Sequence, residues 1–335
     1  MTQLGSRTQL PGRVLVTGGA GFVGATVVRR LASAGIAVRI LDDGRAAGFA
    51  ALEGAGAELI AEDVLVSDLA VALAGVDAIV HLAAQTNIQA SLADPVGDLR
   101  VNVEGTLRLL EAARTAGVPR FVFASSASVI GPVDKPANET TLPRPAVPYG
   151  AGKLAAEAYL HAYFATYGMV TTSLRFANVY GPFARHKQSV VPRFIRAALA
   201  GEPLIVYGDG GQTRDFVHVE DLAELIAAVL AADSVQVGGR VFHGASGRET
   251  TVRRLAELVL SFGPDGGRIE QLPERRGDVA HSCADIALAR SMLGYAPRMT
   301  LEVGLAATMD WFRADLIAAR SSVALAPEGR DMVAT

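Results

Sequence analysis

The feature that most constrains the fold is a glycine-rich turn at residues 17–24, with the sequence TGGAGFVG. An apolar, β-branched run, RVLVT, precedes this turn, and a segment with helical periodicity follows it. Gly18, Gly21 and Gly24 have the spacing that lets a backbone turn tightly and approach a pyrophosphate at the N-terminus of a helix. The order of strand, turn and helix therefore predicts a dinucleotide site in an α/β fold.

Strand-like apolar runs alternate with helical segments along most of the chain. After the second strand, IAVRILDD, come AELIAED, DAIVHLAA, RFVFASS, VTTSLRFANVY and RVFHGAS. Helices are expected between most of them, notably at 96–116, 149–167 and 219–232. Half of the residues are hydrophobic, enough for a large core. We expect a Rossmann-type, doubly wound parallel sheet covered by helices on both faces.

The pattern changes after about residue 178, where loop-like segments rich in glycine, proline and basic residues begin. Because a further helix and a last strand of the sheet are expected before residue 246, the second region should be interleaved with the first. We predict a dinucleotide-binding domain at 1–178 plus about 216–246. A smaller α/β domain would occupy about 179–215 plus 247–320, and residues 321–335 would form a mobile tail.

Charge and cysteine content exclude several classes of protein. Only 19% of the residues are charged and the formal net charge is -3, which gives no reason to expect a nucleic acid or a membrane as partner. The single cysteine, Cys283, excludes an intrachain disulfide and is expected to pack rather than to react. No signal peptide, membrane span or metal-ligand spacing is evident, and His81 is expected at a strand end in the core. These observations predict a cytoplasmic protein without a metal.

Two carboxylates, Asp42 and Asp43, end the second strand. Asp42 lies where a carboxylate should meet the adenosine ribose 2′-hydroxyl and repel a 2′-phosphate, so NAD is favoured over NADP. Arg45 is a counter-signal, because a guanidinium there could bind that phosphate. Asp43 is expected mainly as a solvated turn residue, and Asp63 either approaches the adenine or caps the following turn.

The segment PYGAGK at 148–153 allows two interpretations. A Walker A loop fails at two positions, because Val147 stands where its first glycine belongs and Leu154 where it needs Ser or Thr. The alternative is a pair, Tyr149 and Lys153, which share one face of a helix. An ammonium and a cationic nicotinamide ring would lower the phenol pKa from about 10 toward neutrality, as a proton-transfer group requires. Ser126, at the end of the preceding strand, could bind the same substrate oxygen.

Seven motifs together carry a resemblance from about residue 13 to 315: TGGAGFVG, HLAAQ, NVEGT, SSASVIG, PYGAGK, LRFANVYGP and GDGGQTRDFVHVED. The chain resembles the extended short-chain dehydrogenase/reductase family, and within it the nucleotide-sugar epimerase/dehydratase group. The resemblance implies bound NAD, a nucleotide-sugar substrate held by the smaller domain, and a catalytic set of Ser126, Tyr149 and Lys153. It also implies a homodimer formed through the helices at 96–116 and 149–167.

The resemblance assigns further residues to each ligand. The NAD-binding set is Gly18, Gly21, Phe22, Val23, Gly24, Asp42, Asp43, Asp63, Val64, Leu82, Ala83, Ala84, Asn102, Tyr149, Lys153 and Phe176. The substrate-binding set is Thr86, Ser126, Asn178, Val191, Phe194, Tyr207, Arg214, Arg275 and Ser282. Arg214 and Arg275 would grip the diphosphate or its ribose, Val191 and Phe194 would lie near the base, and the alternative for Arg214 is a salt bridge with Asp215.

The residues after Ser126 bear on the reaction. A 4,6-dehydratase of this group has Asp-Glu after the catalytic Ser or Thr, whereas this chain has Ala127 and Ser128. The SSASVIG stretch is similar to SSATVYG of UDP-galactose 4-epimerases, so the resemblance favours 4-epimerisation of a UDP-hexose, UDP-GlcNAc or UDP-glucuronate. A 4-ketoreductase or a non-catalytic NAD-binding protein are the alternatives.

Several basic residues bear on the identity of the substrate sugar without fixing it. Arg185, His186, Lys187 and Arg193 form either a solvated loop or a site for a sugar carboxylate. Gly152 and Ile130 replace the serine and tyrosine usual in the group, which bears on local packing and fine substrate choice and not on the basic chemistry.

Overall fold

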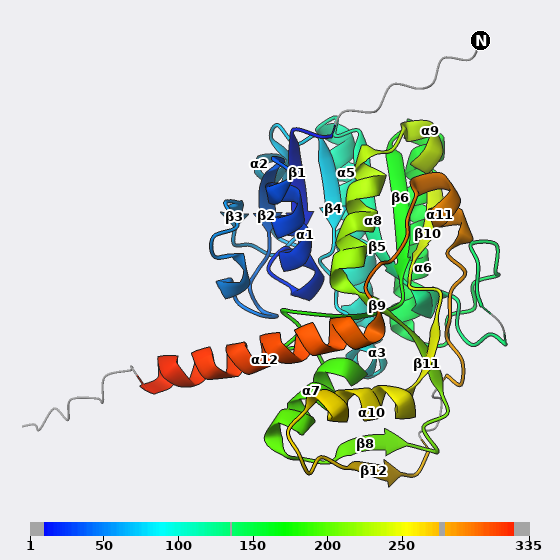
Figure 1. Cartoon of the computed structure of the whole chain (residues 1–335). Helices are drawn as coiled ribbons and strands as arrows, with labels where there is room; N and C mark the ends of the chain where they lie inside the picture. The colour runs from blue at the N-terminus through cyan, green and yellow to red at the C-terminus, as the bar shows by residue number, and fades with distance from the viewer. Residues whose placement is uncertain (1–9, 135, 275–278, 325–335) are drawn as a thin grey trace, which may run out of the picture.

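A seven-stranded parallel sheet dominates the computed structural model, which describes residues 10–134, 136–274 and 279–324 (Figure 1). Its strand order is β10-β6-β5-β4-β1-β2-β3. The strands are β1 (Arg13–Thr17), β2 (Ala37–Leu41), β3 (Glu58–Ile60), β4 (Ala78–His81), β5 (Arg120–Ser126), β6 (Val170–Phe176) and β10 (Arg240–Gly244). This order reverses direction between β1 and β4, the place where a Rossmann sheet binds a dinucleotide. The predicted fold class is confirmed.

Helices cover both faces of this sheet, and the pleat of the strands explains two separate cores. Val14 and Val16 point toward the face covered by α1 and α8, whereas Leu15 points toward α2, α5 and α6. The helical segments of this Rossmann region are α1 (Phe22–Ser33), η1 (Ala50–Leu52), α2 (Leu69–Leu73), α3 (Ile88–Ala93), α4 (Pro95–Leu99), the π-helical η2 (Arg100–Glu104), α5 (Gly105–Thr115), η3 (Ala127–Val129), α6 (Pro148–Tyr167), α8 (Val219–Ala231), α9 (Ser234–Val237) and α11 (Ala287–Leu293).

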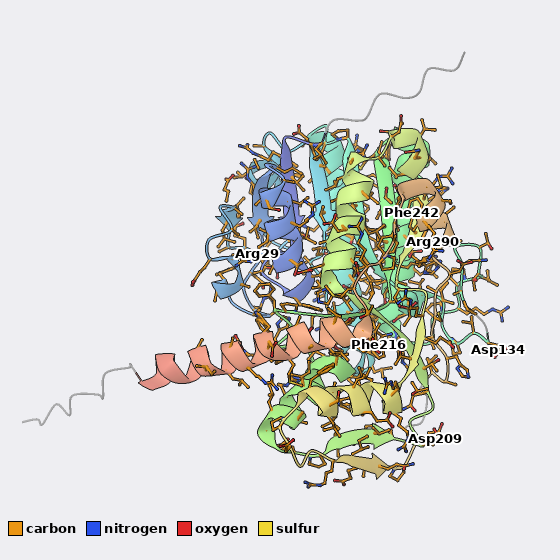
Figure 2. The ribbon with its side chains drawn as sticks, viewed as in Figure 1. Arg29, Asp134, Asp209, Phe216, Phe242 and Arg290 are labelled. Atoms are coloured by element: carbon orange, nitrogen blue, oxygen red, sulfur yellow. The ribbon has the colours of Figure 1, made fainter. Side chains whose placement is uncertain are left out.

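A smaller region lies beyond the carboxyl ends of the strands and has its own hydrophobic core (Figure 1). Two small sheets, β11-β9-β7 and β12-β8, pack there with three helices. These elements are β7 (Asn178–Tyr180), α7 (Val190–Ala200), β8 (Leu204–Tyr207), β9 (Thr213–His218), β11 (Glu249–Thr251), α10 (Val252–Phe262), β12 (Ile269–Leu272) and α12 (Leu301–Ala324). Figure 2 shows Phe242 of β10 within the Rossmann region and Phe216 of β9 near its border with the smaller one.

Two predicted elements differ from the structure in their bounds. The helix expected at 96–116 is three consecutive segments, because a π-helical turn separates α4 from α5. The helix before the C-terminus, α12, continues to Ala324, four residues into the segment expected to be an irregular tail. Residues 325–335 lie outside the described residues. Of the described helices, none is long and apolar enough to cross a membrane.

Candidate active site

The glycine-rich turn joins β1 to α1 as its sequence predicts. Gly18 has a φ of 70°, and a Cβ there would lie 2.6 Å from the backbone nitrogen of Ala83. A Cβ on Gly24 would lie 2.1 Å from the carbonyl oxygen of Gly18. Gly21 is the N-cap of α1 and supplies no side chain, so no side chain caps the first N–H groups of the helix. This backbone cradle fits the pyrophosphate of a dinucleotide.

Asp42 is held in place by the backbone around it. Its carboxylate accepts hydrogen bonds from the N–H groups of Ala20, at 2.9 Å, and Gly44, at 2.8 Å. Burial raises the pKa of the Asp42 carboxyl, and these two bonds partly oppose that shift. The side chain therefore stands at the end of β2 beside the glycine-rich turn, where the ribose of a bound NAD is expected.

Arg45 is engaged by two carboxylates. Its guanidinium pairs with Asp43 at 2.6 Å and also with Asp63. Asp63 additionally accepts a hydrogen bond from the N–H of Leu65 at 2.9 Å, which is the turn-capping role that the sequence left open for it. Because two carboxylates compensate the Arg45 charge, Arg45 is weaker evidence for binding of the 2′-phosphate of NADP.

The other residues predicted to bind NAD lie on or next to this edge of the sheet. The turn after β4 brings Leu82 and Ala83 against Gly18. Asn102, in the π-helical turn, donates a hydrogen bond to the carbonyl of Gln85 and accepts one from its N–H, so it fixes the segment that follows Ala84. Burial differs within the set: Phe22, Val64 and Phe176 are buried, and Val23 is half-buried.

His81 is a core histidine at the end of β4, as expected. Its Nδ1 lies 2.6 Å from the Thr17 hydroxyl, and its Nε2 lies 3.0 Å from the Thr106 hydroxyl. Burial lowers the pKa of His81 to about 3, with a smaller contribution from the Lys153 ammonium, so the ring is neutral. Among the described residues, no group of three or more His, Cys, Asp or Glu side chains could hold a metal ion.

Ser126, Tyr149 and Lys153 come together where β5 ends and α6 begins. The Ser126 hydroxyl lies near enough to the Tyr149 phenol to lower its pKa, and it accepts a hydrogen bond from the Ser128 N–H at 3.1 Å. Pro148 starts α6 one residue before the tyrosine, and the helix then places Lys153 on the same face. The Lys153 ammonium donates to the carbonyl oxygen of Ala124 at 2.9 Å and lies 6.0 Å from the centre of the Tyr149 ring.

The pKa of Tyr149 in the structure differs from the sequence-based expectation that it falls toward neutrality. Burial raises the pKa of Tyr149 to about 12, opposed by the Ser126 hydroxyl and reinforced by the Asp98 charge. Burial also lowers the pKa of Lys153 to about 7, opposed by Asp98 and Glu157. The side chains of the protein therefore do not by themselves move the Tyr149 pKa toward neutrality, because burial outweighs the Ser126 hydroxyl.

Two acidic residues beneath the site were missed from the sequence. Glu157, one turn after Lys153, forms a buried ion pair with Arg175 at 2.7 Å and accepts a 2.5 Å hydrogen bond from Ser125. Asp98 accepts a 3.0 Å hydrogen bond from the Asn102 side chain. The spacing of Lys153 and Glu157 could have indicated the first, whereas the sequence around Asp98 contains no comparable signal.

The structure accounts for part of the unusual PYGAGK sequence. A Cβ on Gly150 would lie 2.4 Å from the Ser128 carbonyl oxygen, so no side chain fits there. A Cβ on Gly152 would lie 3.2 Å from the Asp98 carboxylate, a tight contact with a side chain rather than with backbone. Ile130 is buried in a small apolar cluster with Val129 and Ala137.

The residues predicted to bind substrate are spread over both regions. Thr86 follows β4, and its hydroxyl accepts a 2.9 Å hydrogen bond from Lys187. Asn178 opens β7 and is half-buried, as are Tyr207 on β8 and Ser282. Arg275 lies outside the described residues.

Two residues of the predicted substrate-binding set lie in the core of the smaller region. Val191 and Phe194 of α7 are only 2% and 1% exposed and pack in the core of the smaller region, so their side chains offer almost no surface to a nucleotide base. Their apolar character serves the packing of the helix.

Arg214 and Asp215 serve different purposes on β9. The Arg214 guanidinium donates to the carbonyl oxygens of Thr213 and Val279, whereas Asp215 is fully buried and accepts hydrogen bonds from the N–H groups of Ser246 and Gly247. Neighbouring residues of a strand face opposite sides, which separates the two side chains.

Burial, followed by the Asp215 charge, raises the pKa of Cys283 to about 12, so this thiol is no nucleophile.

Comparisons with known proteins agree on one group. The model of the NAD dependent epimerase/dehydratase family matches residues 14–243. A UDP-glucose 4-epimerase of Mycolicibacterium smegmatis is 40% identical, covering 90% of this chain and 98% of that protein. A dTDP-glucose 4,6-dehydratase of Streptomyces niveus is 33% identical, with coverages of 90% and 93%. The structure of a Thermus thermophilus UDP-glucose 4-epimerase in complex with NAD matches with a TM-score of 0.83 and 35% identity, over 90% of this chain and 99% of that one.

Proposed function

The chain belongs to the NAD dependent epimerase/dehydratase family, and on this premise we propose that it catalyses 4-epimerisation of a UDP-activated sugar. The observation that supports this most directly is the cluster of Ser126, Tyr149 and Lys153 at the carboxyl end of β5, on the same edge of the sheet as the glycine-rich turn that follows β1. A proton-transfer group next to a dinucleotide site is what the reversible oxidation of a sugar hydroxyl requires.

NAD would lie along the edge formed by the turn after β1, Asp42 and the segment after β4. The first N–H groups of α1 would bind its pyrophosphate, and Asp42 its adenosine ribose. Once bound, NAD supplies a reversible acceptor for the hydride of C4 and a positive charge beside Tyr149. Lys153, whose ammonium donates a hydrogen bond to the Ala124 carbonyl, would bind the nicotinamide ribose.

Tyr149 would take the proton of the sugar 4-hydroxyl on its phenolate oxygen and later return it to the same oxygen of the substrate. Ser126 would hold that oxygen in place by a hydrogen bond. The phenol pKa of about 12 in the protein alone means that the tyrosine becomes a competent base only beside an additional positive charge. Proton abstraction is thereby coupled to the presence of the oxidised cofactor.

The proposal of epimerisation rather than loss of water rests on residues 127 and 128. Ala127 and Ser128 form the short helical turn η3, where the family's dehydratases have an acidic pair. With no acid or base at these positions, the simplest course is a turn of the 4-keto sugar in the site and reduction of its opposite face. The cofactor is then regenerated in each cycle.

The test is to incubate the purified protein with UDP-glucose, UDP-GlcNAc or UDP-glucuronate without added cofactor. We expect formation of the C4 epimer of at least one of them, detected by chromatography, with no net change in the absorbance of reduced nicotinamide. A requirement for stoichiometric NADPH would contradict the proposal and favour a 4-ketoreductase.

We also propose that the protein is a homodimer that pairs through α4, α5 and α6. Large apolar side chains are exposed on α4 and α6, among them Val96, Leu99, Tyr159 and Tyr167. Light scattering of the purified protein should give twice the mass of the chain, and a monomeric mass would contradict this.

A further inference from the structure

A buried polar cluster lies where β5 ends, on the face of the sheet that α6 covers. It consists of Ser125 of β5, Arg175 of β6 and Glu157 of α6, which are 3%, 4% and 7% exposed. Ser125 and Arg175 are register partners on neighbouring parallel strands, so both side chains point to the same face. None of the three has a part in the proposed proton transfer.

Glu157 joins the three elements at one point. One of its carboxylate oxygens accepts a 2.5 Å hydrogen bond from the Ser125 hydroxyl. The Arg175 guanidinium donates to both oxygens, at 3.0 Å from Nε and 2.7 Å from Nη2. Such bidentate pairing fixes the direction of a carboxylate as well as its distance. The cluster therefore holds α6, β5 and β6 together one helical turn after Lys153.

Stability alone does not account for this cluster. Elsewhere on the same face the core is apolar, with Phe121, Phe123 and Leu160 among its residues. A buried ion pair stabilises a fold no more than well-packed apolar side chains of similar volume often do. The Nη1 atom of Arg175 is also buried without a hydrogen-bond partner among the described residues, which costs further free energy. The contact gains direction rather than stability from its polar groups.

The contacts of Lys153 show what depends on that direction. Its ammonium donates to the Ala124 carbonyl oxygen at 2.9 Å and lies 4.6 Å from the centre of the Phe123 ring. These two residues directly precede Ser125 on β5. The strand residue that binds Glu157 therefore follows the two that hold the lysine.

Ser125 is also adjacent to Ser126, the strand residue of the proposed catalytic set. Because Tyr149 and Lys153 both belong to α6, any movement of this helix along β5 displaces both relative to Ser126. The hydrogen bond from Ser125 to Glu157 opposes such a movement, since it weakens steeply when its distance or angle changes.

We propose that Ser125, Glu157 and Arg175 are positioning residues for the reaction. They fix α6 against the end of β5 and thereby set where the Tyr149 phenol and the Lys153 ammonium stand. The inference rests on the proposed 4-epimerase function. Because the three side chains are buried and engaged with one another, they act on the chemical step through α6 and not by contact with the sugar. A misplacement of about 1 Å can cost a reaction about 10²-fold in rate.

The test compares two variants that each delete one buried hydrogen bond between α6 and the sheet. Ser125→Ala removes the bond to Glu157 and leaves the ion pair intact. Thr171→Val, the matched control, removes the 2.7 Å bond from the Thr171 hydroxyl of β6 to the Leu160 carbonyl oxygen, about two turns after Lys153. Both variants should lower the midpoint of denaturant unfolding to a similar extent.

Only Ser125→Ala should slow the reaction. Its kcat should fall about 10- to 100-fold at an unchanged KM, for whichever of UDP-glucose, UDP-GlcNAc and UDP-glucuronate the wild type epimerises. Thr171→Val should keep the kcat of the wild type. A triple variant, Ser125→Ala with Glu157→Met and Arg175→Met, replaces the whole cluster by apolar side chains. It should recover the unfolding midpoint of the wild type without recovering kcat.

Four outcomes would overturn the inference while leaving the epimerase function intact. An unchanged kcat in Ser125→Ala would mean that the cluster serves stability only. Equal losses of kcat in Ser125→Ala and Thr171→Val would mean that any loosening of α6 slows the reaction. A raised KM at an unchanged kcat would assign Ser125 to substrate binding, and recovery of kcat in the triple variant would show that stability limits turnover. A wild type that epimerises none of the three UDP-sugars would instead reject the function itself, and the inference with it.

Discussion

The edge formed by Ser126, Tyr149 and Lys153, for which we propose the catalytic role, and the 181–189 connection between β7 and α7 are held in place by different means. The edge belongs to a central strand and a long helix, and its key side chains are 8% exposed at Tyr149 and 2% at Lys153. The connection is held mainly by side chains of α1 and α12. A strand and a long helix therefore position the side chains of the edge, whereas the conformation of the connection depends on side chains of other elements.

Removal of the Tyr149 hydroxyl tests the edge and should have the largest effect. Tyr149→Phe should lower kcat by about 10²- to 10⁴-fold for every UDP-sugar that the wild type accepts, because the proton-transfer group is lost. Steady-state kinetics with two different UDP-sugars check this, and bound NAD should stay at the wild-type level. Turnover close to that of the wild type would show that Tyr149 is not the base.

A side chain in the glycine-rich turn tests whether the edge depends on its cofactor cradle. In Gly24→Ala the new Cβ would lie 2.1 Å from the Gly18 carbonyl oxygen, so the turn must shift. We expect about a tenfold or greater loss of NAD affinity, from an overpacking cost of about 1–3 kcal/mol. Calorimetric titration of the NAD-free protein measures it.

Gly117→Ala is the matched control for this cradle. Gly117 also has a positive φ, of 71°, but no atom lies within 4 Å of its virtual Cβ. The variant should lose about 1–2 kcal/mol of stability through backbone strain alone. Its NAD affinity should equal that of the wild type, and a comparable loss of affinity would mean that Gly24 acts through stability.

The buried lysine of the edge should make stability depend on pH. Because the pKa of Lys153 falls to about 7 on folding, the unfolded chain binds more protons than the folded one between pH 7 and the ordinary lysine value. The free energy of unfolding of the NAD-free protein should therefore rise from pH 7 to pH 9, as the folded state is relieved of a buried charge.

Lys153→Met serves as the control in this experiment. Denaturant unfolding of both proteins at the two pH values should show a smaller rise in the variant than in the wild type. An equal rise in both would mean that other groups cause it, and a wild-type decrease would contradict the direction of the Lys153 shift.

The smallest effect is expected at Gly152, although it lies within the edge. In Gly152→Ser the new Cβ would lie 3.2 Å from the Asp98 carboxylate and in ordinary contact with Asn102 and Val103. Replacing a glycine inside a helix recovers about 0.5 kcal/mol. The free energy of unfolding should change by less than about 1 kcal/mol, and turnover should remain near that of the wild type. Gly150→Ser, whose Cβ would lie 2.4 Å from a carbonyl oxygen, should by contrast be strongly destabilised.

Much of the molecule could be predicted before its structure was known. The alternation of apolar strands and helices leads to the doubly wound sheet, and the glycine spacing leads to the cradle between β1 and α1. The sequence could not predict the engagement of Arg45 by Asp63, because those residues lie in separate turns that only the sheet brings together. The same holds for Thr86 and Lys187, which are 101 positions apart.

Local sequence by itself therefore determined the elements, the turn that can hold a dinucleotide and the pair Tyr149 and Lys153, since these depend on backbone conformation and helical spacing over a few residues. Only the tertiary structure decided the charges of those groups and the direction of Lys187. A pKa depends on burial and on neighbours from every element packed around a group, and the reach of a side chain depends on where the fold anchors its backbone.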